Sequence, residues 1–566
     1  MHADRGNLLL LALCLATISV GFSQRSLMTD DTYHAGVVEF PLLEGTVNQR
    51  TSAAANDFIS IIESNDAADL DILVFPEYVL NGLDTATYVP DPKLNISPCV
   101  SPDYDTFFVE LSCAVRSRGI YVLLNVLEKQ KCGKDLGDPT LNPCPASGVQ
   151  YFNTNVVFDR QGRVIARYRK THLWRNEYYS RAVLQTPDVV TFTTDFGVTF
   201  GTFICFDMLF YEPALKLVRE LNITDIIYST YWFSELPFLT AVQLQEGWAF
   251  ANNVNLLAAD GSKPETRTTG SGIYAGRAGR LIAAIYENST KILLKARLPK
   301  RRANGVPVAE LPAEVLPLFQ PRQVTPRYTK LGLFRDYNVD LFSTELLPSD
   351  FRSEQRRLCH KPSEFCCEFD VARQFSGLPS DHSAYRYRLA AYFGDETTFI
   401  RVDRSEQAVC ALFACTDAEL ASCGRIFPGS IQVANEYYFS AINVSAIFPA
   451  APRRLIMPST VDGVMLPLPV AQYSWTEKQG PSGNTSVQMV LTAPKNDLLT
   501  FGIWANYYTE LPSLHNLDHM HPGSSSTGTG GSPNANGTTN GTGVAAVSAF
   551  LSTFALFLTG FVMLLC

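Results

Sequence analysis

The sequence predicts an α/β domain at residues 30–300 and a mostly β domain at residues 328–515. Segments typical of strands and of helices alternate in the first region, and this alternation favours an α/β layer structure. The second region has few helical periods and many β-like runs, so we expect mostly strands and a disulfide-containing core there. Proline and basic residues gather between the two regions, and residues 301–327 are therefore predicted to be a linker.

The first domain should contain its strands and helices in alternating order. The expected elements are, in chain order, a strand at 34–40, a helix at 53–64, a strand at 71–78, a helix at 104–118, a strand at 120–129, a hairpin at 151–170 that turns at 161–162, a hairpin at 189–207 that turns near 195–197, a strand at 225–233, an amphipathic helix at 238–252 and a strand at 255–260. In the second domain, β-like runs lie at 382–393, 397–403, 437–448, 463–470 and 486–494.

The first residues have the three regions of a secretory signal. Arg5 precedes an apolar run from Leu8 to Val20, and small residues follow at Gly21 and Ser23. An N-terminal membrane helix is the alternative, but this run is shorter than the roughly 20 apolar residues that cross a bilayer. We expect residues 1–23 to be a signal peptide that is removed.

The last residues have the layout of a glycolipid-anchor (GPI) signal. Residues 544–566 are apolar and uncharged, and a stretch rich in Gly, Ser, Thr and Asn at 516–543 predicts a flexible stalk. A single-pass helix is the alternative, yet no basic residue follows the apolar run. We expect attachment near Asn534 and a mature protein on the outer face of the cell membrane.

The cysteine count agrees with an extracellular protein. Thirteen cysteines become eleven if Cys14 and Cys566 leave with the end segments, so one is left over when the others pair. If Cys205 stays free, ten cysteines in two groups of four and six could form five disulfides within their own domains, with the pairing left open. They are Cys99, Cys113, Cys132, Cys144, Cys359, Cys366, Cys367, Cys410, Cys415 and Cys423.

Glycosylation sequons and charge narrow the classes of partner. Asn-x-Ser/Thr sequons, which function only in the secretory pathway, occur at Asn95, Asn222, Asn288, Asn443, Asn484, Asn536 and Asn540. A net charge of −9 and the scarcity of Lys/Arg runs argue against nucleic acid, because phosphate binding needs a concentrated basic face. A small molecule or peptide fits better as substrate, and the sequence leaves the oligomeric state open.

Cys205 is the first candidate for chemistry. It lies at the end of a β-rich run and just before the helical stretch 213–221. A strand-to-helix turn is expected to expose the side chain and, near a helix N-terminus, to favour the thiolate. A buried structural cysteine is the alternative.

Glu77 and Lys170 are the two other candidates, and each lies at the carboxyl end of a predicted strand, as Cys205 does. That edge is where α/β sheets collect their active groups. A partly buried carboxylate such as Glu77 can act as general base. A surface glutamate, and a solvated lysine beside Arg167 and Arg169, are the alternatives.

Three motifs in this order resemble those of the nitrilase, or carbon–nitrogen hydrolase, superfamily: VFPEY around Glu77, YRKTHL around Lys170 and GTFICFD around Cys205. The segment STYWF around Trp232 and the segment TGSGIYA at 269–275 are similar to the vanin and biotinidase branch. The resemblance covers nearly the whole chain between its two end segments, and it is strongest from His34 to about Pro299.

The resemblance implies an α-β-β-α sandwich and an amidohydrolase with Glu77 as general base, Lys170 as stabiliser of the oxyanion and Cys205 as nucleophile. The backbone N–H of Phe206 would join Lys170 at the oxyanion, and residues around Trp232, Phe233 and Phe238 would line the acyl pocket. Neither a metal nor an organic cofactor is needed for this chemistry. The histidines at 515, 519 and 521 are interpreted as an exposed tail and not as a metal site.

Three functions follow as hypotheses. The first is a pantetheinase-like enzyme that cleaves pantetheine to pantothenate and cysteamine, and the second is a biotinidase-like hydrolase of biotinyl amides. The third is a catalytically silent surface protein, which the retained Glu77, Lys170 and Cys205 argue against.

Overall fold

The computed structural model describes residues 25–101, 103–133, 144–184, 186–302, 304–311, 328, 330–377, 383–395, 405–429, 431, 433 and 436–508. All of them belong to one compact unit. The expected signal peptide, the stalk with Asn534, Asn536 and Asn540, the three histidines and the apolar tail lie outside the described residues, as does the predicted strand 397–403. Most of the expected linker lies outside them too.

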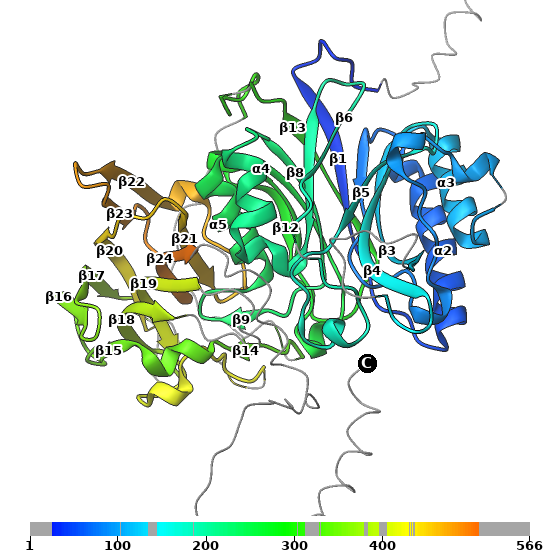
Figure 1. Cartoon of the computed structure of the whole chain (residues 1–566). Coiled ribbons are helices and arrows are strands. Elements are labelled where there is room, and N and C mark those ends of the chain that lie inside the picture. Colours follow the sequence, from blue (N-terminus) through cyan, green and yellow to red (C-terminus); the bar gives the residue numbers. More distant parts are fainter. Residues whose placement is uncertain are drawn as a thin grey trace, which may run out of the picture. The chain divides into compact units, whose positions relative to one another are not determined.

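Two mixed sheets form the first half of the described chain (Figure 1). The first sheet has the strand order β13 (Ile292–Pro299), β1 (Thr32–Glu39), β2 (Ile72–Val74), β3 (Tyr121–Lys131), β4 (Val149–Phe158) and β5 (Val164–Arg169). The second has the order β12 (Arg280–Ala284), β11 (Ser271–Ala275), β10 (Asn255–Asp260), β8 (Asp225–Thr230), β7 (Thr199–Ile204) and β6 (Val190–Thr193). Both predicted hairpins are confirmed as β4–β5 and β6–β7.

The two sheets pack face to face with helices on the outside. Apolar residues such as Val37 of β1 and Leu257 of β10 fill the space between the sheets. Helices α2 (Val47–Glu63) and α3 (Thr106–Arg118) cover the first sheet, with Phe58 and Phe108 in the core beneath them. Helix α5 (Ala241–Asn252) packs on the second sheet, near the short helix α4 (Lys216–Arg219). The predicted α-β-β-α sandwich is therefore confirmed.

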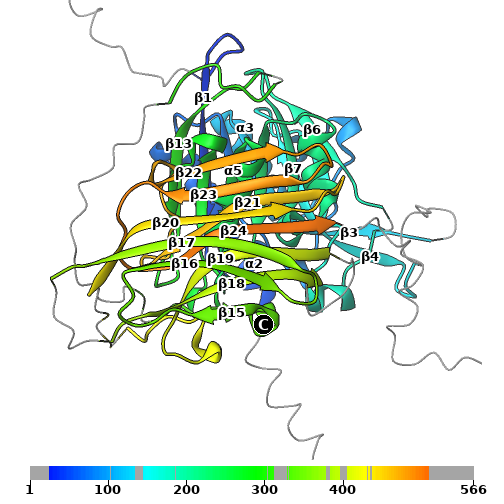
Figure 2. The ribbon, with the colours of Figure 1, turned by 90° about the vertical axis from the view of Figure 1, so that its left-hand side faces the viewer.

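Two five-stranded sheets form the second half, and their strands lie one sheet behind the other in Figure 2. One has the order β15 (Ser343–Leu346), β18 (Arg386–Asp395), β19 (Ser405–Cys415), β24 (Leu498–Tyr508) and β21 (Arg454–Asp462). The other has the order β16 (Ser353–His360), β17 (Phe365–Phe375), β20 (Tyr437–Phe448), β23 (Thr485–Leu491) and β22 (Tyr473–Gln479). All neighbouring strands are antiparallel, which confirms the mostly β character predicted for this region.

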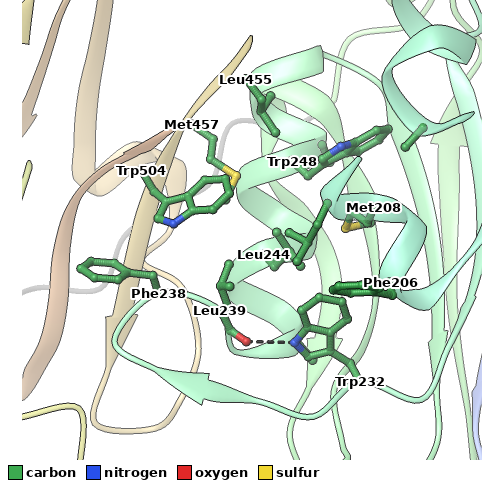
Figure 3. Close-up of a cluster of buried hydrophobic side chains, with 14 of the residues drawn as sticks. Phe206, Met208, Trp232, Phe238, Leu239, Leu244, Trp248, Leu455, Met457 and Trp504 are labelled. Atoms are coloured by element: carbon green, nitrogen blue, oxygen red, sulfur yellow. Dashed lines mark hydrogen bonds between the residues drawn. The ribbon is translucent and has the colours of Figure 1, made fainter. Parts of the chain in front are cut away.

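Helix α5 is buried on every side, so the prediction of an amphipathic helix at 238–252 is wrong about its second face. One face packs on the second sheet and the other packs on β21 and β24 (Figure 3), where Leu244 and Trp248 approach Met457 and Trp504. At Gly247 a Cβ would lie 2.7 Å from a backbone oxygen of β21, so only glycine permits this approach. The polar residues of the helix are buried as well and have partners: Gln243 donates to Ser459, Gln245 donates to the Gly270 carbonyl, and Glu246 pairs with Arg280.

The predicted strand at 463–470 is also wrong. This segment is a turn and a loop that lead into a short 3-10 helix at Val470–Gln472. Pro467 and Pro469 lack the N–H that a strand interior uses for pairing, which explains the difference.

Five disulfides confirm that the ten cysteines pair within their own groups. The pairs are Cys99–Cys113, Cys132–Cys144, Cys359–Cys366, Cys367–Cys410 and Cys415–Cys423. Among the described cysteines Cys205 alone is free, as the odd count predicts.

Candidate active site

Three strand ends bring Glu77, Lys170 and Cys205 to the same edge of the sandwich. Lys170 directly follows β5 and Cys205 directly follows β7, while Glu77 lies in the loop after β2, which ends at Val74. Lys170 Nζ donates a hydrogen bond of 2.7 Å to Glu77 Oε1. Both residues are 3% exposed, so the surface alternatives considered for them do not hold.

Cys205 sits at a sharp turn where β7 passes into a 3-10 helix (Cys205–Leu209). Its φ of 47° is in the left-handed region, which is uncommon for a residue with a side chain and is found at strained functional turns. Tyr228 Oη donates to the Cys205 carbonyl at 2.9 Å and fixes the peptide. The predicted turn is confirmed, but its predicted exposure is wrong, because Cys205 is 7% exposed and lies in an apolar cluster.

Burial also decides the protonation of the thiol. It raises the pKa of Cys205 well above its usual value, the negative charge of Glu77 raises it further, and Lys170 opposes both. The expectation that the turn favours thiolate is therefore wrong for the resting site. A buried neutral thiol needs a base before it can attack, and Glu77 is the adjacent carboxylate.

Glu77 is held in place by three donors. Besides Lys170 it accepts hydrogen bonds from Asn153 Nδ2 at 2.7 Å and from the Tyr231 N–H at 3.0 Å. Burial raises the pKa of Glu77, while the charge of Lys170 acts in the opposite direction. A carboxyl group with a raised pKa can accept and return a proton near neutral pH, which is what general acid–base chemistry requires.

A second carboxylate, Glu177, also binds Lys170, and no pattern in the sequence indicates it. Glu177 Oε2 accepts hydrogen bonds from Lys170 Nζ at 2.8 Å and from the Trp174 N–H at 2.7 Å. Burial acts to lower the pKa of Lys170, but Glu177 and Glu77 outweigh burial and raise this pKa well above its usual value. Lys170 is therefore a fixed positive charge beside Cys205.

A buried network of asparagines supports both carboxylates. Asn153 Nδ2 donates to Glu77 Oε1 and to Glu177 Oε1, each at 2.7 Å, and Asn153 Oδ1 accepts from Asn125 Nδ2 at 2.8 Å. On the same face of β4, Asn155 Nδ2 donates to Thr202 Oγ1 of β7 at 3.0 Å. Each buried amide has partners, as a rigid polar network requires, and the network ties the first sheet to the strand that carries Cys205.

Asp207 joins the loop of Lys170 to the turn of Cys205. It is fully buried, and its carboxylate accepts from Tyr168 Oη at 2.7 Å, from the His172 N–H at 2.9 Å and from the Ile204 N–H at 3.0 Å. His172 Nδ1 lies 2.8 Å from Asp207 Oδ1. The aspartate of GTFICFD thus binds both the tyrosine and the histidine of YRKTHL. The tyrosine and the histidine lie two residues before and two residues after Lys170, and the aspartate lies two residues after Cys205.

Trp232, expected in the substrate pocket, is 7% exposed and lies beside Phe206 (Figure 3). Its indole N–H donates to the Leu239 carbonyl at 2.9 Å, and its backbone N–H donates to Asp260 Oδ1 at 2.9 Å. The indole is therefore fixed before any substrate arrives. Phe206 also meets Trp174, with 4.8 Å between ring centroids in an edge-to-face arrangement.

The expected glycosylation sites differ in exposure. Asn95, Asn222 and Asn288 are exposed, whereas Asn443 and Asn484 are half-buried. Asn443 Oδ1 accepts a hydrogen bond from Gln488, and Asn484 Oδ1 accepts one from the Ala450 N–H. In both residues these bonds engage the side-chain oxygen and not the amide nitrogen to which a glycan is joined.

Two further findings concern only the part of the chain that the structure describes. It holds no group of three or more His, Cys, Asp and Glu side chains that could bind a metal ion. None of its helices has the length and apolar character that crossing a bilayer requires.

Comparison with known proteins finds two families along the chain. Residues 47–306 match the carbon-nitrogen hydrolase family, and residues 331–511 match the vanin C-terminal domain. Vanin-like protein 1 of Drosophila melanogaster is 39% identical over 513 residues, which are 88% of this chain and 89% of the relative.

Similarity extends to vertebrate proteins. Pantetheine hydrolase VNN2 of Homo sapiens is 31% identical over 436 residues, covering 73% of this chain and 78% of the relative. Pantetheinase of Bos taurus is 31% identical over 395 residues, covering 68% of this chain and 69% of the relative.

Proposed function

The chain belongs to the vanin family of carbon–nitrogen hydrolases and is a hydrolase of non-peptide amide bonds, and from this premise we propose that Glu77, Lys170 and Cys205 are its catalytic triad. The observation that supports the triad best is the buried Lys170–Glu77 pair next to Cys205, which alone among the described cysteines is free. We further propose a pantetheinase-like substrate, pantetheine, which would give pantothenate and cysteamine.

The acylation half of the reaction begins at the neutral thiol. Glu77 takes the proton of Cys205 Sγ as the sulfur attacks the amide carbon and a C–S bond forms. The carbonyl oxygen becomes an oxyanion, which Lys170 Nζ and the Phe206 N–H stabilise. The C–N bond then breaks, the proton held by Glu77 passes to the amine, and the amine leaves.

The second half hydrolyses the thioester. Glu77, again a carboxylate, takes a proton from a water molecule that attacks the thioester carbon, and a second oxyanion forms in the same place. The C–S bond breaks, the carboxylic acid leaves, and the sulfur recovers its proton from Glu77. Glu177 stays bound to Lys170 throughout, so the lysine keeps the charge that stabilises both oxyanions.

The proposed substrate is tested with the purified ectodomain and a panel of pantetheine, biotinyl amides and simple aliphatic amides. We expect kcat/KM for pantetheine to exceed that for the other amides by at least about tenfold, because a pocket built for one acyl group discriminates by roughly that factor or more. The measurement is steady-state release of the amine from each substrate. Preference for biotinyl amides would contradict the pantetheinase-like proposal, and no hydrolysis of any amide would support a silent surface protein.

The proposed location is the outer face of the cell membrane, where a glycolipid attached near Asn534 would hold the protein. Residues 1–23 would be removed as a signal peptide, and glycans would be joined at Asn95, Asn222, Asn288, Asn443 and Asn484. Treatment of intact expressing cells with a phosphatidylinositol-specific phospholipase should release most of the amidase activity into the medium, because small residues suited to glycolipid attachment precede the apolar residues 544–566. Activity is measured in medium and cells, with a fusion to a genuine membrane helix as control. Activity that stays on the cells, or peptides from residues 544–566 in the mature protein, would contradict the anchor.

A further inference from the structure

A short segment from the second half of the chain pairs with the segment of the catalytic half that directly follows Trp232 and Phe233. Strand β14 (Phe334–Arg335) pairs in parallel with β9 (Glu235–Leu236), which follows Trp232 in sequence, and the two are adjacent in Figure 1. The Phe334 N–H donates to the Ser234 carbonyl at 2.9 Å. Two residues earlier in the chain, the Gly332 N–H donates to the Pro264 carbonyl at 2.9 Å. These backbone bonds fix the register of the segment on the catalytic half.

Arg335 binds the segment to the second half of the chain. Its guanidinium makes two hydrogen bonds of 2.9 and 2.7 Å to the carboxylate of Asp340 and donates to the carbonyls of Leu420 and Cys423, each at 3.1 Å. Cys423 is itself held by the disulfide to Cys415. The direction of the neighbouring Phe334 side chain is thus determined by both halves of the chain.

The ring of Phe334 is half-buried and contacts three side chains of the catalytic half, those of Phe233, Arg175 and Arg267. Its centroid is 6.3 Å from that of Phe233, in an edge-to-face arrangement. The guanidinium carbons of Arg267 and Arg175 lie 4.0 and 5.5 Å from the same centroid. Such cation–π contacts hold a ring in one orientation.

A row of half-buried aromatic side chains connects Phe334 with the triad. Phe233 lies 5.8 Å from Tyr231 and 6.5 Å from Trp174, centroid to centroid. The Tyr231 N–H donates to Glu77, and Trp174 packs against Phe206, which directly follows Cys205. Two paths of ring contacts therefore lead from the residues next to Cys205 and Glu77, through Phe233, to Phe334.

We propose that Phe334 is a specificity-determining residue that forms the far wall of the subsite for the acyl group. The partly exposed ring offers an apolar face, and Arg175 and Arg267 beside it favour neutral or anionic acyl groups with acceptor oxygens over cationic ones. This inference rests on the proposed amidase function and on the acyl pocket expected around Trp232. It assigns to the second half of the chain a direct part in substrate choice.

The test uses the full ectodomain with Phe334→Ala and two series of amides. One series lengthens the acyl group from acetyl to pantothenyl with a fixed amine, and the other varies the amine with a fixed short acyl group. We expect KM for the longest acyl group to rise roughly tenfold with kcat nearly unchanged, because loss of a contact remote from the reacting carbon removes uniform binding. Acetyl amides should keep their wild-type KM and kcat, and Phe334→Tyr should restore the KM of the long acyl amide.

Matched controls separate this role from a purely structural one. Phe375 is 52% exposed at the end of β17, and its ring packs against Tyr437 of β20 in the second half of the chain, so Phe375→Ala should leave every KM unchanged. Equal losses for acetyl and pantothenyl amides in Phe334→Ala, an effect confined to the amine series, or no effect at all would each overturn the proposal. A wild-type enzyme that hydrolyses none of the amides would instead contradict the proposed function itself.

Discussion

Cys205→Ala should lower amide hydrolysis by at least about 1,000-fold, which corresponds to roughly 4 kcal/mol of transition-state stabilisation. The nucleophile is removed, and none of the other cysteines that the structure describes has a free thiol to replace it. Alanine has nearly the same backbone preferences at a φ of 47°, so the turn should persist. Steady-state kcat/KM on the best amide of the panel, with circular dichroism and Tm to verify folding, measures the effect.

Alkylation provides an independent control on the same residue. Iodoacetamide should modify Cys205 and no other cysteine of residues 25–508 under non-reducing conditions, with a rate that rises with pH. The alkylation rate should rise with pH because burial raises the pKa of this thiol and keeps it protonated at neutral pH. A folded Cys205→Ala variant with turnover near that of the wild type, or a disulfide at Cys205, would refute the nucleophile.

Asp207→Ala should destabilise the fold by roughly 3 to 5 kcal/mol, the range seen when one partner of a buried pair is removed. The substitution leaves Tyr168 Oη and two backbone N–H groups without their buried acceptor, and the His172 ring loses its carboxylate. Because this carboxylate connects the Lys170 loop to the Cys205 turn, activity should fall with stability. Denaturant unfolding gives the free energy, and the amide assay gives kcat/KM.

The exposed Asp195→Ala serves as its control. Asp195 forms an ion pair of 2.8 Å with Arg160 and its side chain is 55% exposed, so its loss should cost no more than about 1 kcal/mol. Asp207→Asn, which keeps two acceptor sites at most, should lie between wild type and alanine. If Asp207→Ala proved no more destabilising than Asp195→Ala, the connecting role would be wrong.

The sequence predicts the strand ends that carry Glu77, Lys170 and Cys205, because strand periodicity locates the edge at which side chains of an α/β sheet converge. It does not predict the partners that come from other loops. Glu177 stands in a short 3-10 helix (Arg175–Tyr179) with no periodic signal. Asn153 and Asn155 did leave a signal, because two buried asparagines on the strand face that they share with Val149, Tyr151 and Val157 must be hydrogen-bonded.

Local sequence pattern does not predict the exposure of a residue when the residues that cover it come from distant parts of the chain. The exposure and charge of Cys205 depend on the apolar cluster around it, and the second face of α5 is covered by strands more than 200 residues away. Proline and basic residues indicate a boundary near 301–327, whereas the described residues on both sides share one compact unit. Sequence alone therefore predicts the layers but not how the halves meet.

That shared core has a thermodynamic consequence. Gln243 of α5 donates to Ser459 Oγ of β21, and the ring of Trp504 packs among residues of the catalytic half (Figure 3). Neither half can therefore unfold without exposing the buried surface of the other. Cooperative units coincide with such continuous cores. The Cys205 turn and the antiparallel sheets should accordingly melt in one transition, and a mutation in a sheet remote from the chemistry would reduce the amount of active enzyme without altering its turnover.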